Sequence, residues 1–151
     1  MESKDLKDSY YRYLRYFLAK DDSTATSYDK YMALAYAVRS ELVDSWIKTQ
    51  KNYHEKNVRR VFFLSMEYVF GKSLHQNMLN LGIEAPITAA VRSLGFSIEE
   101  LFLQEDDFEL GYAGKGRVAA CYLESLATLG IPAMGYGLRY DYAQFQQEIK
   151  N

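Results

Sequence analysis

Apolar side chains recur at helical spacing through the first third of the chain. Leucine, tyrosine and phenylalanine residues return every three or four positions between residues 6 and 18, as on one face of an α-helix. The polar run 21–24 interrupts this pattern. A second helix is expected from Thr26 or Ser27, either of which can cap it, to about Glu55. Its apolar stripe comprises Tyr31, Leu34, Ala35, Val38, Leu42 and Trp46.

Short apolar runs separated by glycine and proline fill the middle of the chain. The predicted elements are a buried strand at 60–65, helices at 71–81 and 86–95, and a short helix opened by Ser97-x-x-Glu100. Gly82 and Gly95 are expected to end the two longer helices, and Pro86 fits a first helical turn. The acidic run 105–109 is expected to form a solvated turn.

The last third predicts a helix at 114–129, which Gly130 and Pro132 end, followed by a strand at 133–140. A third strand at 145–149 is possible. Gly135 and Gly137 suggest that another backbone passes close by. Two or three strands do not form a self-sufficient sheet, and open edges invite pairing. The chain therefore has the pattern of the opening part of a larger α/β domain, with residues 1–151 as one segment.

Composition excludes several classes of protein. The 151 residues are 48% hydrophobic and 25% charged, with a net charge of −2, so neither a nucleic-acid nor a membrane partner is expected. No apolar run approaches the ~20 residues of a membrane span, and no signal peptide is evident. The lone Cys121 excludes an internal disulfide and is expected in the core. These features predict a cytoplasmic protein without a metal site.

Three glycines mark the candidate site. Gly111, Gly114 and Gly116 precede the predicted helix in the order G-x-x-G-x-G. Unpaired N–H groups and the positive end of the helix dipole can hold a phosphate or a sugar oxygen there. An ordinary helix start explains the same glycines. A nucleotide-binding domain is disfavoured, because the order is not G-x-G-x-x-G and the loop follows the acidic run rather than a predicted strand.

Five segments carry a family resemblance. The stretches at 117–130 (RVAACYLESLATLG) and 136–140 (YGLRY) resemble those after the glycine loop of the glycogen/starch (α-1,4-glucan) phosphorylases. The stretch at 59–67 (RRVFFLSME) resembles their first strand, and 71–81 (GKSLHQNMLNL) the following helix. The stretch at 44–50 (DSWIKTQ) resembles the end of their long early helix. The resemblance, collinear from about Tyr10 to Ile149, implies the helix-rich N-terminal part of a doubly wound, glycosyltransferase-like (GT-B) domain with an incomplete sheet.

The resemblance also implies an activity. These enzymes use orthophosphate to release the terminal glucose of an α-glucan as glucose 1-phosphate, and they carry pyridoxal phosphate on a lysine. The region with that lysine, and the C-terminal domain that binds the cofactor, are absent from the match, so no complete catalytic set is expected. We expect a truncated form that is inactive alone and whose full-length relative is a homo-oligomer. The alternative is a non-catalytic binding module, or a gene remnant, on the same scaffold.

The glycine loop departs from the family pattern. Where the family has G-N-G-G-L-G-R, this chain has GYAGKGR at 111–117. The implied substrate and phosphate loop therefore contains Gly111, Tyr112, Ala113, Gly114, Lys115 and Gly116. Lys115 could contact a phosphate or remain a solvated lysine, and both interpretations stay open. Glu67 matches an acidic family residue near this loop.

Further implied positions also differ. Val69 stands where the family has a tyrosine near the cofactor ring, and Lys72 replaces a common arginine. Gln50, Lys51 and His54 match the site at which the animal enzymes bind AMP, but only Gln50 keeps the residue type. Control by AMP is therefore not expected.

Overall fold

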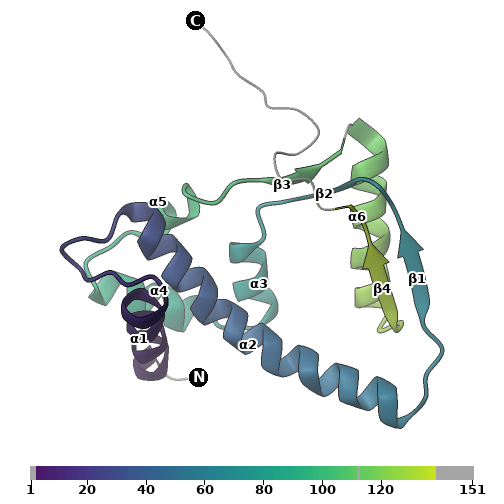
Figure 1. Ribbon diagram of the computed structural model, residues 1–151, viewed down its shortest axis with the longest axis horizontal. Helices are drawn as coiled ribbons and strands as arrows, with labels where there is room; N and C mark the ends of the chain where they lie inside the picture. The colour runs from purple at the N-terminus through teal and green to yellow at the C-terminus, as the bar shows by residue number, and fades with distance from the viewer. Residues whose placement is uncertain (1–2, 112, 139–151) are drawn as a thin grey trace, which may run out of the picture. The chain divides into compact units, whose positions relative to one another are not determined.

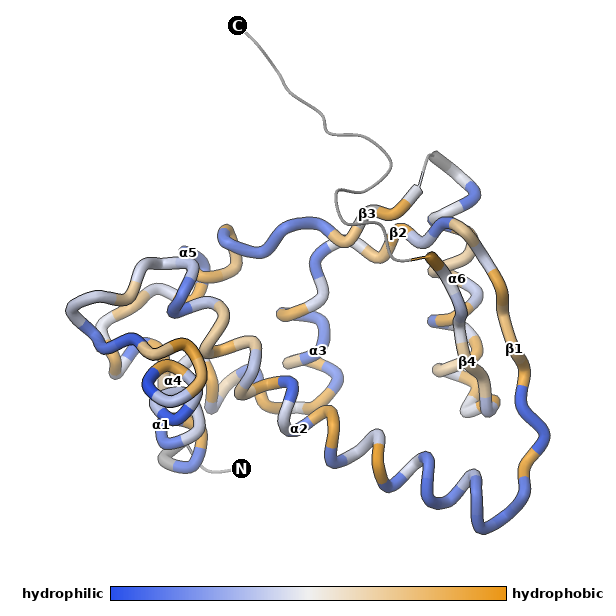
Figure 2. The backbone as a smooth tube through the Cα atoms, viewed as in Figure 1, coloured by the Kyte–Doolittle hydropathy of each residue, from blue (hydrophilic) through white to orange (hydrophobic). Residues whose placement is uncertain are grey.

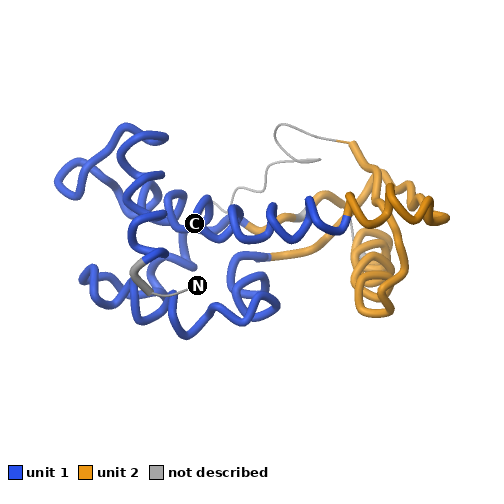
Figure 3. The backbone as a smooth tube through the Cα atoms, turned by 90° about the horizontal axis from the view of Figure 1, so that it is seen from below, with its two compact units in different colours: residues 1–49, 72–106 blue, residues 50–71, 107–151 orange. Residues whose placement is uncertain are grey.

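The computed structural model describes residues 3–111 and 113–138 as a mixed α/β protein that is mostly helical (Figure 1). The chain forms two compact units, coloured separately in Figure 3. Unit 1 comprises residues 1–49 and 72–106, and unit 2 comprises residues 50–71 and 107–151. Each unit is thus assembled from two separate stretches of the sequence.

Unit 1 is helical. Its elements are α1 (Ser3–Arg12), the single π-helical turn η1 (Tyr13–Phe17), most of α2 (Ser27–Glu55), α3 (Leu74–Asn80), α4 (Glu84–Ser93) and α5 (Ile98–Phe102). The two predicted N-terminal helices are confirmed. Thr26 caps α2 reciprocally with Asp29, because each side-chain oxygen accepts a hydrogen bond from the other residue's backbone N–H. Pro86 lies in the first turn of α4, as expected, and the Ser97 hydroxyl accepts from Glu100 N.

The core of unit 1 joins the apolar faces of its helices. Its largest fully buried side chains are Tyr10, Leu6, Leu14, Leu34, Met78, Ile87, Val38 and Val91. Along α2 the apolar residues alternate with polar ones from turn to turn (Figure 2). The predicted stripe of α2 is buried at Leu34 and Val38, but Trp46 is exposed. The stripe is therefore wrong at its C-terminal end.

A carboxylate from a distant turn caps α3. Glu105 is only 8% exposed, and its Oε1 accepts hydrogen bonds from the backbone N–H groups of Ser73 (2.7 Å) and Leu74 (3.0 Å). The expected solvated turn is therefore wrong at Glu105, although Asp106 and Asp107 are exposed. The predicted helix at 71–81 is also wrong at its start, because Gly71 ends a strand and α3 begins at Leu74.

The turn between η1 and α2 is organised by one aspartate. Asp21 Oδ1 accepts from the hydroxyl of Ser23 (2.7 Å) and the hydroxyl of Thr24 (2.9 Å), and also from both backbone N–H groups. These bonds favour the charged carboxylate and lower the pKa of Asp21 from 3.8 to about 2.

Unit 2 contains two small sheets and one helix. Strands β1 (Val61–Leu64) and β4 (Ala133–Tyr136) pair in parallel, while β2 (Tyr68–Gly71) and β3 (Phe108–Leu110) pair antiparallel. Helix α6 (Ala113–Thr128) connects β3 to β4. Gly130, at φ +65°, follows the end of α6 as predicted. Tyr68 spans the parallel pair, since its hydroxyl lies within hydrogen-bond distance of Phe63 O and Tyr136 O.

Three expectations about unit 2 are corrected. β1 is not buried, because β4 is its only neighbour among the described strands and Leu64 is 76% exposed. Cys121 is exposed rather than in the core. The close neighbours of Gly135 and Gly137 are chiefly the side chains of Leu123 and Tyr68 rather than a passing backbone.

Two predicted strand segments fall outside the residues that the structure describes. The end of the predicted strand at 133–140 and the possible third strand at 145–149 lie outside them. Within the described part of the chain, no helix combines the length and apolarity needed to cross a bilayer.

We expect Glu105→Ala to destabilise unit 1 by about 1–3 kcal/mol, because it leaves the buried N–H of Leu74 and the part-buried N–H of Ser73 at the start of α3 without their acceptor. Urea unfolding followed by circular dichroism measures the change. Asp106→Ala removes an exposed neighbouring carboxylate and should change the free energy of unfolding by less than about 0.5 kcal/mol. Equal effects of the two variants would contradict the role of Glu105.

Acid should reveal the depressed pKa of Asp21. Because the folded-state pKa lies below the ordinary value, the folded protein binds fewer protons than the unfolded chain between these two values. The stabilisation is complete above about pH 4 and is lost as the pH falls toward 2. We expect Asp21→Asn to reduce the loss of stability across this window in thermal melts. A loss of the same size as in the unchanged protein would refute the assignment.

Candidate functional site

The glycine loop joins a strand to a helix. β3 ends at Leu110, Gly111 follows at φ +154°, and α6 begins at Ala113. The loop therefore follows a strand, which corrects the expectation of an acidic turn directly before it. Ala113 lies within the helix, and Tyr112 lies outside the described residues.

Glu67 lies directly against Gly111. A Cβ atom at Gly111 would be 2.8 Å from Glu67 Cβ and 3.2 Å from Glu67 Oε2, too close for any larger residue without a shift. The turn that carries Glu67 is fixed by Ser65, whose hydroxyl donates to Glu67 O (2.7 Å) and accepts from Glu67 N (3.2 Å). The structure thus brings together two of the site residues that the sequence indicated.

The first turn of α6 packs closely on β2. A Cβ atom at Gly116 would be 2.7 Å from Val69 Cγ2, and Gly116 is buried. Arg117 Nη1 donates to Val69 O at 3.4 Å, which fixes the same contact from the neighbouring residue. No heavy atom lies within 4 Å of a Cβ built at Gly114. Packing therefore requires glycine at 111 and 116 but not at 114.

The exposed side of this turn carries a positive charge. Gly114 and Lys115 are both exposed at the N-terminal end of α6. The first N–H groups of a helix have no intrahelical partner, and an ammonium beside them favours a bound anion. A carboxylate such as Glu67 can accept hydrogen bonds from sugar hydroxyls. The arrangement is suited to binding a phosphate or a sugar at the loop.

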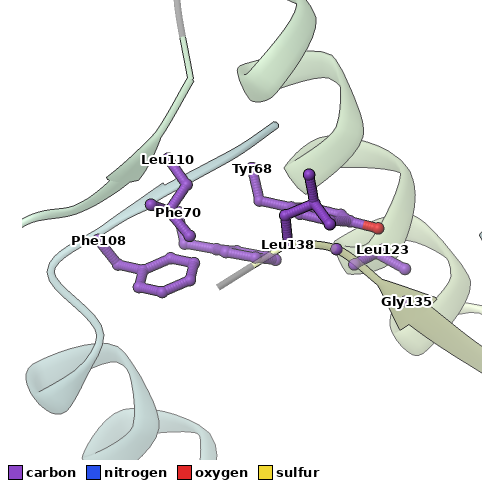
Figure 4. Close-up of a pocket in the computed structure, with 8 residues that line it drawn as sticks. Tyr68, Phe70, Phe108, Leu110, Leu123, Gly135 and Leu138 are labelled. Carbon is purple, nitrogen blue, oxygen red and sulfur yellow. The ribbon is translucent and has the colours of Figure 1, made fainter. Parts of the chain in front are cut away.

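An apolar cavity of about 300 Å³ lies elsewhere in unit 2 (Figure 4). Its walls are Tyr68, Phe70, Phe108, Leu110, Leu123, Gly135, Gly137 and Leu138. The rings of Tyr68 and Phe70 stack at 5.8 Å. The Tyr68 hydroxyl is the polar side-chain group of these walls, and it already contacts two backbone carbonyl oxygens. The cavity has an apolar lining and offers no acid or base, so the glycine loop remains the better candidate site.

The implied effector positions lie at the end of α2. Gln50, Lys51 and His54 occupy its last turns, where Lys51 Nζ pairs with Glu55 Oε1 at 3.8 Å on the exposed surface. Residues 3–111 and 113–138 contain no group of three or more histidine, cysteine, aspartate or glutamate side chains that could hold a metal ion.

Two contacts of the site are not predicted from the sequence. In the sequence Val69 is a replaced tyrosine of the family pattern, whereas in the structure it is the residue on which Gly116 packs. Arg117 is part of a family motif, whereas in the structure it donates a hydrogen bond to β2. The sequence signal for both contacts is Gly116, because a glycine inside a helix often marks the close approach of another element.

Comparisons with known proteins agree with the resemblance. A family model described as carbohydrate phosphorylase matches residues 91–151, which include β3, the glycine loop, α6 and β4. The chain is 47% identical over 147 residues to the liver form of glycogen phosphorylase of Homo sapiens. It is 44% identical over 147 residues to the brain form of Bos taurus, and 46% over 145 residues to the muscle form of Ovis aries.

These alignments cover 97%, 97% and 96% of this chain, and the chain spans 17% of the length of each relative. The similarity includes the long helix α2, the strand β1 and the glycine loop in one collinear order. The chain belongs to the glycogen phosphorylase family.

Proposed function

We propose that this chain forms the first part of the N-terminal domain of an α-1,4-glucan phosphorylase. The complete relative would release terminal glucose from glycogen, starch or maltodextrin with orthophosphate, as a cytoplasmic homo-oligomer. The observation that carries this proposal is the 47% identity with a glycogen phosphorylase over 97% of the chain. The parallel pairing of β1 with β4 supports a doubly wound, GT-B-like domain of which residues 1–151 are one segment.

In this proposal the residues from Gly111 to Gly116 bind substrate. The packing of Gly111 on Glu67 and of Gly116 on Val69 fixes the start of α6. The exposed N–H groups and Lys115 would then contact the phosphate, and Glu67 would orient a sugar hydroxyl. Gln50, Lys51 and His54 would not form a site for AMP, because two of the three positions have changed type.

The described residues do not fit pyridoxal phosphate by themselves. A lysine that carries this cofactor as a Schiff base is typically desolvated, which lowers its pKa. The lysines that the structure describes in unit 2 are Lys51, Lys56 and Lys115, and all three are exposed. We infer that any cofactor of the complete relative is held by another part of that protein.

A second function is favoured by the altered loop. Tyr112, Ala113 and Lys115 replace three residues of the family pattern, while the contacts that hold the scaffold are intact. A non-catalytic module, or a gene remnant, would keep the scaffold and lose the chemistry. Such a module could bind a sugar phosphate or a partner phosphorylase.

The chain alone should not degrade glycogen. The lysines that the structure describes in unit 2 are all exposed, so we expect no phosphate-dependent release of glucose 1-phosphate above a blank without protein. A coupled assay with phosphoglucomutase measures this release. Sustained turnover by the purified 151-residue chain would refute the proposal that catalysis needs other parts of a phosphorylase.

Binding of orthophosphate or glucose 1-phosphate tests the loop directly. We expect Lys115→Ala to weaken the binding about two- to fivefold, the effect of one charge at a helix end. Isothermal titration calorimetry measures the dissociation constants. Lys56→Ala, which removes another exposed lysine of unit 2, should leave them unchanged. Unchanged affinity after Lys115→Ala would remove Lys115 from the site. No binding at all by the unaltered chain would favour a gene remnant, or a module that binds only a partner phosphorylase.

A further inference from the structure

A polar cavity of about 510 Å³ lies in unit 1, with residues of α1 on one wall and residues of α2 on the other. Its walls are Asp5, Asp8, Ser9, Arg12, Ser40, Glu41 and Asp44. Binding sites for small molecules typically have volumes of about 300–1,000 Å³. The glycine loop belongs to unit 2, so this cavity is a second candidate site.

The walls of the cavity carry an excess of negative charge. Four carboxylates and one guanidinium give them a net charge of −3, whereas the whole chain has a net charge of −2. Asp5 and Asp8 are three positions apart on α1, and Glu41 and Asp44 are three positions apart on α2. Like charges at this spacing share a helix face and repel each other. A cation bound between the two helices would relieve both repulsions.

Three of these carboxylates have no basic partner. Within residues 3–111 and 113–138, no lysine, arginine or histidine forms an ion pair with Asp8, Glu41 or Asp44. The guanidinium of Arg12 lies over the ring of Tyr13, with its central carbon 5.4 Å from the ring centroid. The cation of the cavity wall therefore does not neutralise the acidic side chains around it.

A buried hydroxyl also faces the cavity. Ser9 is 9% exposed and forms part of the wall, and no other residue that the structure describes makes a hydrogen bond with its hydroxyl. A buried hydroxyl without a partner costs free energy, which a ligand at this wall can recover. The Ser40 hydroxyl donates its proton to Tyr36 O at 3.1 Å, so toward a ligand it can only accept. The walls are therefore suited to a ligand that donates hydrogen bonds.

The arrangement favours an extended organic cation over a metal ion. A metal ion needs several ligands that converge on one point, and the described residues contain no such group of acidic side chains. An ammonium group has three N–H donors and no acceptor. In a linear polyamine, several ammonium groups are spaced along a slim methylene chain, so one molecule can reach carboxylates on both helices and the buried hydroxyl between them.

We propose that the cavity between α1 and α2 binds a linear polyamine with three ammonium groups. The ammonium groups donate hydrogen bonds to the carboxylates of Asp8, Glu41 and Asp44 and to the hydroxyl oxygen of Ser9. Three positive charges match the net charge of the walls. The bound amine links α1 to α2 and stabilises unit 1. This site is independent of the glycine loop and of the proposed enzymatic function.

Isothermal titration calorimetry of the whole chain with spermidine, a triamine that is fully protonated at neutral pH, tests the proposal at low ionic strength. We expect one spermidine to bind per chain. Asp8→Asn combined with Asp44→Asn should weaken binding at least about tenfold, because it removes one charged acceptor from each helix. Ser9→Ala should weaken binding about two- to fivefold, the effect of one hydrogen bond.

Glu100→Gln combined with Asp106→Asn is the matched control. It removes the same two negative charges from exposed positions of unit 1 that are not part of the cavity walls. The affinity for spermidine should then change by less than about twofold, and circular dichroism establishes that every variant stays folded. Equal weakening by the two double variants would show a general attraction of amines to an acidic protein and would overturn the proposal. So would no binding of spermidine, or binding that Asp8→Asn with Asp44→Asn leaves unchanged.

Two further titrations distinguish other occupants of the cavity. We expect magnesium chloride and a lysine-rich peptide each to bind more weakly than spermidine. Magnesium that binds at least as tightly, and loses its affinity in the Asp8→Asn, Asp44→Asn variant, would identify a metal site instead. A peptide that binds more tightly than spermidine and depends on the same two aspartates would identify a basic protein segment as the ligand. Either result would overturn the assignment to a polyamine.

Discussion

Tyr68 is the residue on which the arrangement of unit 2 depends. Its hydroxyl lies 3.1 Å from Phe63 O and 2.9 Å from Tyr136 O, so one side chain reaches both strands of the parallel pair. Its ring occupies the space that a Cβ atom at Gly137 would need, and it stacks on Phe70. The next residue back along the chain is Glu67, beside Gly111. The position of the carboxylate at the glycine loop thus follows from the way Tyr68 is anchored in the sheet.

Packing explains two of the three glycines of the loop but not the third. Gly111 and Gly116 are fixed by contacts with Glu67 and Val69, whereas Gly114 has open space around it. Retention of the first two glycines is therefore explained by packing and would persist without any ligand. The altered positions 112, 113 and 115 lie between these packing contacts. This distribution accounts for a chain that keeps the family scaffold while its candidate binding loop differs.

Local signals in the sequence predict the helices well. The predictions of burial at Glu105 and β1 are wrong, because burial there depends on contacts between distant segments. The ends of α4 and α6 follow from glycines that adopt positive φ angles, which depend only on neighbouring residues. By contrast, the sequence around Glu105 is typical of a solvated turn, and only the contact with the start of α3 explains its burial. β1 has the composition of a buried strand, but its exposure depends on which elements cover it. The contacts of the loop with Glu67 and Val69 join distant segments, and no spacing in the sequence encodes them.

The interleaving of the two units has a consequence during synthesis on the ribosome. β1 and β2 are made before residues 72–106 complete unit 1, and the partner β4 follows only after α6. The aromatic strand Val61–Leu64 therefore stays without its partner strand while about seventy more residues are translated, which takes several seconds. During that delay the nascent chain exposes an unpaired apolar segment to solvent. The strand is therefore a suitable binding site for a chaperone.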